Sequence, residues 1–332
     1  MQPFEMLEQE WARFNGLDPA GMVACSSGTA ALHLALEAFQ LPPGSEVIVP
    51  DYGMIACPRA VTLAGLTPVF VDCDERLLMD ERLAAGIQDQ PKVNVAMFVH
   101  VYGRKCNMLG IYESIDKKNL LLVEDLAEAH GIKPHKCTDA ACWSFYRNKI
   151  VAGEEGGAAW FRDPKHAELA RSLRCLGFTD AHDYRHLPRG HNYRMSNAHA
   201  NLILHGGANA LDKYPDTSYQ RWKIEAWYDE FCPDEWRMPK RDAVWVYDVR
   251  VAGLTRAKMD GIVGLLKTQN IQARHGFAPM TEQEEYRGCR LVGSGGMSRR
   301  AADEVFYLPC DPATVTRESC ARVFDGIKAA LR

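Results

Sequence analysis

The sequence predicts an α/β protein with a mostly parallel β-sheet in a large domain and a smaller α+β domain at the C-terminal end. The first observation is that, from residue 20 to about residue 135, short apolar runs alternate with stretches of helical period. Such runs form buried strands, and strands joined through helices lie parallel. The second is size, because 332 residues, 47% of them hydrophobic, can fill a large core and a smaller one. We place the domains at residues 1–208 and 209–332.

The elements of the large domain follow in a regular order. A helix over residues 4–14 ends at Asn15-Gly16, and a second helix begins after Cys25 and runs to about residue 39. Strands are expected at residues 22–25, 46–49, 68–71, 93–99, 120–123, 141–146 and 157–161. Further helices are expected at residues 55–63, 81–87, 109–117 and 165–173. This alternation places helices on both faces of the sheet.

The second domain follows from a change in this order. Helices over residues 198–211 and 218–231 connect the domains, and a strand of alternating character covers residues 243–251. A helix at residues 256–266 and an amphipathic helix at residues 316–331 complete the chain. Because helices and strands no longer alternate regularly, we expect an α+β domain here.

Composition excludes several classes of protein. The formal net charge of −4 gives no overall field that attracts nucleic acid or an acidic membrane. No apolar run approaches the roughly 18 residues of a membrane span. The first residues lack the basic and apolar regions of a signal peptide, so we expect a cytoplasmic protein. The eleven cysteines include no Cys-x-x-Cys pair, so we expect free thiols, no disulfide and no metal site.

Two polar stretches beside the predicted strands suggest ligand binding. Residues 25–32 read Cys-Ser-Ser-Gly-Thr-Ala-Ala-Leu and open a helix whose free N–H groups suit a phosphate. A plain Ser or Thr N-cap is the alternative. Asp125 lies where an apolar strand ends, at the edge of an α/β sheet where ligands gather. A helix N-cap is the alternative for this residue also.

Lys149 ends an aromatic run at residues 143–148, and glycines follow at positions 153, 156 and 157. Partial removal from water disfavours the ammonium form, which lowers the pKa of a lysine and makes a free amine available. A lysine that forms a Schiff base needs this property. The alternative is an ordinary lysine at the end of a strand.

These stretches, with a loop at residues 190–196, resemble the DegT/StrS-type sugar-nucleotide aminotransferases. Members of that family are pyridoxal-phosphate enzymes of fold type I, the aspartate aminotransferase fold. The family pattern Ser-Gly-Thr-x-Ala-Leu is matched at residues 27–32, and Glu-Asp-x-Ala-x-Ala-x-Gly at residues 124–131. Ser-Phe-x-x-x-Lys is matched at residues 144–149, and Asn-Tyr-Arg-Met at residues 192–195. The matches are specific for the cofactor and the fold, and less so for the substrate.

The resemblance implies a role for each matched residue. Lys149 would form the Schiff base with pyridoxal 5′-phosphate and carry a proton during transfer of an amino group, most simply from glutamate to a keto-sugar or related carbonyl. Asp125 would keep the pyridine nitrogen protonated, because a neighbouring anion raises the pKa of that nitrogen. Asn192 would reach the phosphate in the neighbouring subunit, which implies a homodimer with shared active sites. The phosphate ligands within the chain would be Gly28, Thr29 and Ser144.

Several positions depart from the family pattern. Glu128 replaces the usual glutamine that faces the 3′-oxygen of the cofactor, and Met54 replaces the usual aromatic on the cofactor ring. Val246 stands where the family has a histidine after Trp245. The family also carries a longer segment before its first helix than this sequence does. We therefore expect a more open substrate pocket.

An alternative reaction class fits an open pocket as well. A pyridoxal-phosphate decarboxylase acting on an amino acid attached to a nucleotide or to modified DNA would use the same cofactor site. Nucleic acid is expected only as such a substrate, and no membrane partner is expected. Lys149 argues against a non-enzymatic module and against the dehydratase branch of the family, which has histidine at this position.

Overall fold

The computed structural model describes residues 1–87, 90–108, 120–179 and 184–331. Its centre is an eight-stranded sheet in which only β7 runs antiparallel to its neighbours. All other neighbouring strands are parallel, so the predicted α/β class is confirmed. In spatial order the strands are β1 (Met22–Cys25), β7 (Gly157–Phe161), β6 (Ala140–Ser144), β5 (Leu121–Asp125), β4 (Val93–Val99), β2 (Glu46–Pro50), β3 (Thr67–Val71) and β10 (Leu291–Val292).

The register of the central strands brings their carboxyl ends together. Val99, the last residue of β4, lies opposite Asp125, the last residue of β5, and Asp125 lies opposite Cys142 of β6. The sequence predicted β5 to end two residues earlier, at residue 123. Because Asp125 is itself a residue of β5, its backbone position is fixed by both neighbouring strands.

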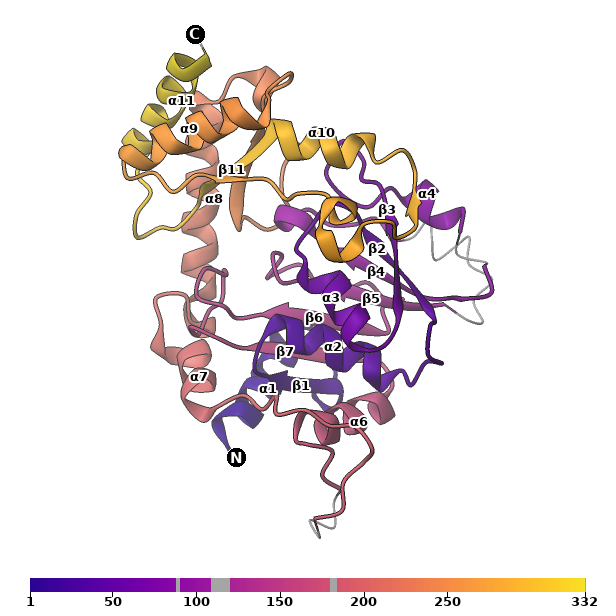
Figure 1. Ribbon diagram of the computed structural model, residues 1–332. Helices are drawn as coiled ribbons and strands as arrows, with labels where there is room; N and C mark the ends of the chain where they lie inside the picture. The colour runs from indigo at the N-terminus through magenta and orange to yellow at the C-terminus, as the bar shows by residue number, and fades with distance from the viewer. Residues whose placement is uncertain (88–89, 109–119, 180–183, 332) are drawn as a thin grey trace.

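Helices cover both faces of this sheet (Figure 1). The ring of Trp11 in α1 (Pro3–Asn15) packs edge-on against Trp143 of β6, with ring centroids 5.8 Å apart. Gly28, the first residue of α2 (Gly28–Ala38), lies against Ser144 of the same strand. Adjacent residues of a strand point to opposite faces, so α1 and α2 lie on opposite sides. The other helices of this part are α3 (Ala56–Leu63), α4 (Glu81–Ala85), α6 (Pro164–Arg174) and α7 (Asn197–Asn201).

A second core follows the long helix α8 (Tyr214–Phe231). A three-stranded antiparallel sheet places β11 (Val305–Pro309) between β8 (Val246–Arg250) and β9 (Arg274–His275). The helices α9 (Arg256–Thr268) and α11 (Arg317–Leu331) pack against each other beside it, at the C-terminal end of the molecule in Figure 1. This mixture of helices and antiparallel strands confirms the predicted α+β character.

Strand pairing and hydrogen bonds also connect the two parts, in addition to the covalent connection of the chain. The strand β10 pairs with β3 in the large sheet although it belongs to the C-terminal half of the chain. Asp72, just after β3, accepts hydrogen bonds from the backbone N–H and hydroxyl of Ser298 in α10 (Gly296–Glu304), at 2.9 and 2.7 Å. The boundary at residues 208/209 stays a prediction.

The structure differs from two expected helices. In place of one helix over residues 198–211, α7 is followed by a π-helical turn at Leu202–Gly206 and a 3₁₀ turn at Leu211–Lys213. Gly206 and Gly207 explain the break, because glycine costs helix stability. The helix expected at residues 109–117 lies outside the described residues. Further 3₁₀ turns are at Pro19–Gly21, Val101–Gly103, Asp234–Trp236, Met280–Glu282 and Glu284–Tyr286.

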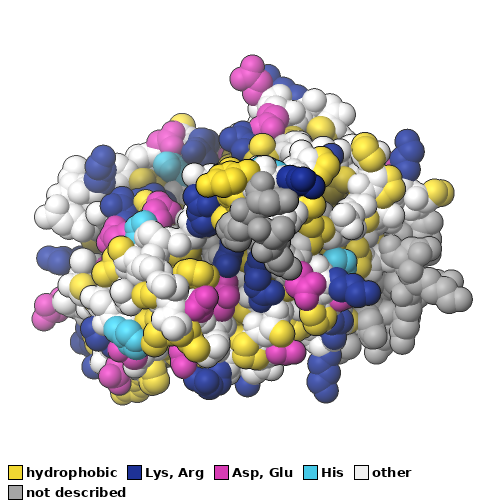
Figure 2. Space-filling view, turned by 90° about the horizontal axis from the view of Figure 1, so that it is seen from below, with side chains coloured by type: hydrophobic (Ala, Val, Ile, Leu, Met, Phe, Trp, Pro, Cys, Tyr) yellow, Lys and Arg dark blue, Asp and Glu magenta, His cyan; other side chains and the backbone are white. Residues whose placement is uncertain are grey.

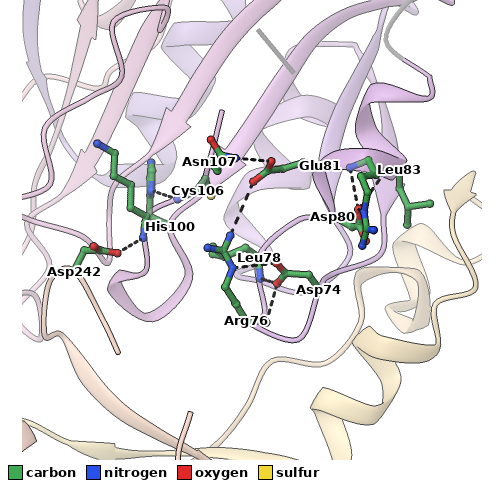
Figure 3. Close-up of polar contacts among 12 residues, drawn as sticks. Asp74, Arg76, Leu78, Asp80, Glu81, Leu83, His100, Cys106, Asn107 and Asp242 are labelled. Atoms are coloured by element: carbon green, nitrogen blue, oxygen red, sulfur yellow. Dashed lines mark hydrogen bonds and ion pairs between the residues drawn. The ribbon is translucent and has the colours of Figure 1, made fainter. Parts of the chain in front are cut away.

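Polar contacts hold the loops after β3 and β4 to each other (Figure 3). The Asp74 carboxylate accepts hydrogen bonds from the N–H groups of Arg76 and Leu78 at 2.8 and 3.1 Å. The Asn107 amide donates to Glu81 at 3.0 Å. The Asp74 bonds close the turn after β3, and the Asn107 bond ties the segment after β4 to the start of α4.

The surface carries both signs of charge. On the face seen in Figure 2, Lys and Arg side chains are interspersed with Asp, Glu and hydrophobic side chains. Within the described ranges, none of the helices combines the length and the apolar character that crossing a membrane would require. All eleven cysteines are free, nine of them buried, which confirms the expectation of thiols.

Candidate active site

Lys149 lies in the loop between β6 and β7, close to the second part of the chain. Its Nζ is 4.0 Å from the centre of the Trp245 indole ring. The indole N–H of Trp245 donates in turn to the carbonyl of Asn148 at 2.8 Å, so the ring is fixed against the loop. Burial lowers the pKa of Lys149, although Glu128 and Asp125 oppose this effect. The lysine therefore has the partial desolvation that the sequence indicated.

Asp125 is buried at the end of β5. One carboxylate oxygen accepts the backbone N–H of Ala127 at 2.9 Å, and the other accepts the thiol of Cys57 at 3.1 Å. Burial keeps the Cys57 pKa well above its ordinary value, so this thiol stays protonated and can donate. The bond from Ala127 is local and is typical of an Asp that caps a turn, which was the alternative role for this residue. The bond from Cys57 links Asp125 to α3.

Glu128 lies three residues further on and is also buried. One of its oxygens accepts the backbone N–H of Tyr102 at 2.8 Å. Burial raises the pKa of Glu128 from its ordinary value of 4.5 to about 7, against the opposing effect of Lys149. The carboxyl group can therefore hold a proton near neutral pH, which removes the charge repulsion that a carboxylate beside a phenolate oxygen would create.

The start of α2 forms a tight cradle. A side chain at Gly28 would place its Cβ 2.7 Å from the Cβ of Ser144, so only glycine allows the helix to approach β6 this closely. Ser27 is the N-cap, and its hydroxyl accepts the N–H of Ala30 at 3.1 Å. Thr29 is partly exposed in the first turn. Free N–H groups at the start of an eleven-residue helix suit a phosphate group.

The structure brings Lys149, Asp125 and Glu128 within electrostatic range of one another and places Gly28 against Ser144. Of the three other expected site residues, Thr29 is partly exposed in the first turn of α2, and two are exposed on the surface. Met54 is 51% exposed, just before α3, and Asn192 is exposed on the loop before α7.

The loop of Asn192 nevertheless runs beside the cradle. The carbonyl of Tyr193, the next residue, accepts the N–H of Ser26 at 2.8 Å.

Two further supports of the site were not predicted as such. The buried pair His100–Glu124, 2.8 Å between Nε2 and Oε2, holds the residue before Asp125. Tyr102 and Gly103 both have positive φ, 53° and 78°, in the turn that presents the Tyr102 N–H to Glu128. A side chain at Gly103 would meet the Ala243 carbonyl at 1.8 Å. A His-x-Tyr-Gly sequence directly after a predicted strand was the available signal.

A cavity of about 480 Å³ adjoins the lysine loop on the side of the second core. Asn148 and Trp245 line it, together with Arg147, Arg221 and Arg274. Arg221 is buried and donates to the Trp245 carbonyl at 2.9 Å. This cavity offers positive charge and amide groups next to Lys149.

Comparison with known proteins gives consistent results. The sequence model of the DegT/DnrJ/EryC1/StrS aminotransferase family matches residues 2–328. A UDP-N-acetyl-3-dehydro-alpha-D-glucosamine 3-aminotransferase from Acidithiobacillus ferrooxidans is 37% identical over 335 aligned residues, 98% of this chain and 88% of that protein. GDP-perosamine synthase from Caulobacter vibrioides is 33% identical over 286 residues, 82% of this chain and 76% of that protein.

The solved structures extend the likeness to the fold. The aminotransferase TlmJ from Streptoalloteichus hindustanus superposes with a TM-score of 0.87 at 26% identity, covering 100% of this chain and 91% of that one. DesV from S. venezuelae gives a TM-score of 0.86 at 29% identity, covering 100% of this chain and 90% of that one.

Proposed function

This chain belongs to the DegT/DnrJ/EryC1/StrS aminotransferase family. From that premise we propose that it transfers an amino group from an amino acid to the carbonyl carbon of a nucleotide-linked keto-sugar. We expect glutamate to be the amino donor. The observation that carries the proposal is the group Lys149, Asp125 and Glu128 at the carboxyl edge of the sheet, beside the cradle of α2. The substrate class is taken from the relatives, whose names describe sugar-nucleotide amino transfer. These names do not favour the decarboxylase alternative.

The residues present fit pyridoxal 5′-phosphate, the cofactor of this family. The cradle of α2 suits its phosphate, with Gly28, Thr29 and Ser144 as ligands, and the buried Asp125 suits its ring nitrogen. When bound, the cofactor supplies an electron sink for the bond that is broken at the substrate carbon. We assign Glu128 to the 3′-oxygen and Met54 to one face of the ring.

Lys149 is the group that moves the proton. Its amine is the form that can accept a proton from the Cα of the donor amino acid, and burial increases the amount of this form at neutral pH. Trp245 stands over Nζ and limits where the side chain can reach. The indole face also attracts an ammonium, so it partly opposes the loss of the proton. Asp125, whose backbone pairs with β4 and β6, would hold the ring nitrogen of the cofactor.

The proposal includes a cytoplasmic homodimer with shared sites. Asn192 is exposed on a loop whose neighbour Tyr193 is bonded to Ser26 at the cradle. An exposed amide in this position is available to a second subunit. The cavity at Trp245 supports an acceptor that carries negative charge, because Arg147, Arg221 and Arg274 line it.

The test is a half-reaction without acceptor. The enzyme loaded with pyridoxal phosphate is mixed with glutamate, and visible absorption and 2-oxoglutarate are measured together. We expect the absorption to fall as one equivalent of 2-oxoglutarate forms, and to return when a nucleotide-linked keto-sugar is added. Release of carbon dioxide without accumulation of the amino form of the cofactor would contradict the proposal.

A further inference from the structure

Three side chains with metal-binding atoms meet outside the active site, on the side of α2 away from its first turn. His33 and Glu37 are one helical turn apart on α2, and His191 comes from the loop before α7. One ligand atom from each lies within 4.8 Å of the others. Nε2 of His191 is 2.5 Å from Glu37 Oε2, and Nε2 of His33 is 3.7 Å from Glu37 Oε1. This is the one such group found among the described residues.

The environment of His33 requires an explanation. Its side chain is 3% exposed, and its Nε2 has no partner at good hydrogen-bond geometry, although the Leu63 backbone also lies near the ring. A buried ring nitrogen without a partner costs free energy, so such atoms are uncommon in folded proteins. The other ring nitrogen, Nδ1, lies 3.2 Å from the hydroxyl of Tyr193. If Nδ1 carries the proton and donates to Tyr193, a free lone pair at Nε2 points toward Glu37.

A neighbouring hydroxyl can fix the tautomer of His33, because the Tyr193 hydroxyl lies 3.2 Å from Nδ1. In metal-bound histidines one ring N–H donates to an outer partner, which fixes the tautomer and leaves the other nitrogen for the metal. The Tyr193 hydroxyl can serve as such a partner for His33. Tyr193 also stacks on the ring of His191, with centroids 4.7 Å apart, and so orients both imidazoles.

The distances suit a tetrahedral ion after small movements. Two ligands at about 2.0–2.1 Å from zinc at a tetrahedral angle are about 3.3 Å apart. The observed separations of 2.5 and 3.7 Å from Glu37 lie on either side of this value. The shorter one is a hydrogen bond, and an ion entering there would replace the hydrogen between His191 and Glu37. His191 is 24% exposed, which leaves solvent access and room for a water as fourth ligand.

One charged group competes for the carboxylate. Arg189 places Nη1 3.7 Å from Glu37 Oε1, but its side chain is 63% exposed. An exposed ion pair of this kind contributes little free energy, and the guanidinium can turn into solvent. Zinc bound by two neutral imidazoles and one carboxylate is a known combination in proteins.

We propose that His33, Glu37 and His191 form a binding site for one divalent transition-metal ion, with zinc as the natural probe. The ion clamps the loop of residues 190–193 onto α2. The cysteine spacing gave no sign of this site, and the sequence had led us to expect no metal. His33 and Glu37 at helical spacing were a partial signal, but their third partner is 154 residues beyond Glu37. The inference stands apart from the proposed reaction, since its tests measure metal binding and not turnover.

The test uses the full-length protein, stripped with a chelator, reloaded with pyridoxal phosphate and freed of amino acids, which would chelate metal together with the cofactor. Zinc is titrated by calorimetry, and cobalt(II) is titrated by visible absorption. We expect one ion per chain and a tetrahedral cobalt spectrum without thiolate charge transfer, because no cysteine belongs to the site. Zinc should also raise the Tm of the wild-type chain.

Three variants make the test specific. Glu37→Gln and His191→Gln keep size and polarity but remove a ligand, so affinity should fall by at least about 10- to 100-fold, the loss that even an outer partner of a ligand causes. His186→Gln is the matched control, an exposed histidine of the same segment that contacts the Leu176 carbonyl, and it should bind like wild type. Should one ligand variant fail to fold, the other and the wild-type titration still decide.

Several outcomes would overturn the proposal. The first is that the wild-type chain binds no metal even at a tenfold excess of metal over protein. The three side chains would then form only a His–Glu hydrogen bond. The second is undiminished binding by both ligand variants. The third is a cobalt spectrum with thiolate charge transfer, which would place the ion on cysteines.

Discussion

Two groups of buried charges lie near the junction of the two cores, and they differ in how their charges are balanced. In the first, Arg104 and Arg241 both bond to Asp248 through their Nη2 atoms, at 2.8 and 2.5 Å, and Arg241 also bonds to Glu225 at 2.8 Å. In the second, Lys149 is near the carboxyl groups of Asp125 and Glu128, but their described hydrogen bonds go to backbone N–H groups and a thiol.

The pKa values follow this difference. Burial alone would raise the pKa of Asp248, but Arg104 and Arg241 hold it below its ordinary value. Burial instead lowers the pKa of Lys149 and raises that of Glu128 to about 7. Charges that are paired stay ionised and fix the structure, whereas Glu128, which has no direct partner of opposite charge, has a pKa near neutral pH and can take part in chemistry. The following changes test this contrast.

The largest effect is expected for Lys149→Ala. Removal of the proton-transferring amine should lower the rate of amino transfer by at least about 10⁴-fold, the upper range for one general base. The free energy of unfolding should change little, because the burial that lowers the pKa of Lys149 also makes its ammonium form costly in the folded chain. Steady-state rates and urea unfolding measure the two quantities. The exposed Lys165→Ala is the control, and an equal loss of activity in it would show that the effect is not specific.

Arg241→Ala should have the opposite profile. It leaves the buried Asp248 and Glu225 without their shared partner, so the free energy of unfolding should fall by about 3–5 kcal/mol. The folded fraction should keep its cofactor binding. Arg256→Ala removes an exposed pair with Asp260 and should cost no more than about 1 kcal/mol. Urea unfolding of both variants checks the difference, and equal costs would refute the structural role of the Arg241 group.

Asp125→Asn should slow the reaction by about 10²–10³-fold, the effect of removing one preorganised electrostatic contact. A neutral amide of the same size preserves the bond from Ala127 but cannot keep a ring nitrogen protonated. Cofactor affinity, measured by fluorescence titration, should stay within a few-fold of wild type. Near-normal turnover would leave Asp125 as only a turn residue.

Glu128→Gln should have the smallest effect and should appear in the pH dependence of stability. The folded-state pKa of Glu128 is raised from 4.5 to about 7, so the folded chain holds this proton more tightly than the unfolded chain. The stabilisation is fully present below pH 4.5 and is lost as pH rises to about 7. Wild-type stability relative to the Gln variant should therefore fall across this window. Parallel curves from urea unfolding at several pH values would contradict the raised pKa.

A contact can be predicted from the sequence when the residues that make it are close together along the chain. The cradle and the end of β5 are local patterns, so Gly28, Asp125 and the parallel strands around them could be expected from short stretches. The strands β9 and β10 were missed because two residues carry no periodicity. The contacts of Glu128 with Tyr102 and of His191 with Glu37 join residues 26 and 154 positions apart, and only folding brings them together.

Eight site residues have roles predicted from the sequence, and these roles remain predictions about chemistry. Lys149, Asp125, Glu128, Gly28 and Ser144 lie in contact or within electrostatic range of another member of the set. Met54 and Asn192 are exposed, as we expect if their partners are a cofactor and a second subunit. A single sequence shows which residue types stand at such positions, but not what covers them.

We propose that Lys149 is the lysine that holds the cofactor. The direct measurement is reduction of the pyridoxal-phosphate-loaded enzyme with borohydride, followed by proteolysis and mass mapping of the modified peptide. We expect loss of the visible band and one modified residue, Lys149, in the tryptic peptide of residues 148–162, which trypsin leaves uncut at the modified lysine. Modification of a different lysine, or no cofactor bound after reconstitution, would contradict the account.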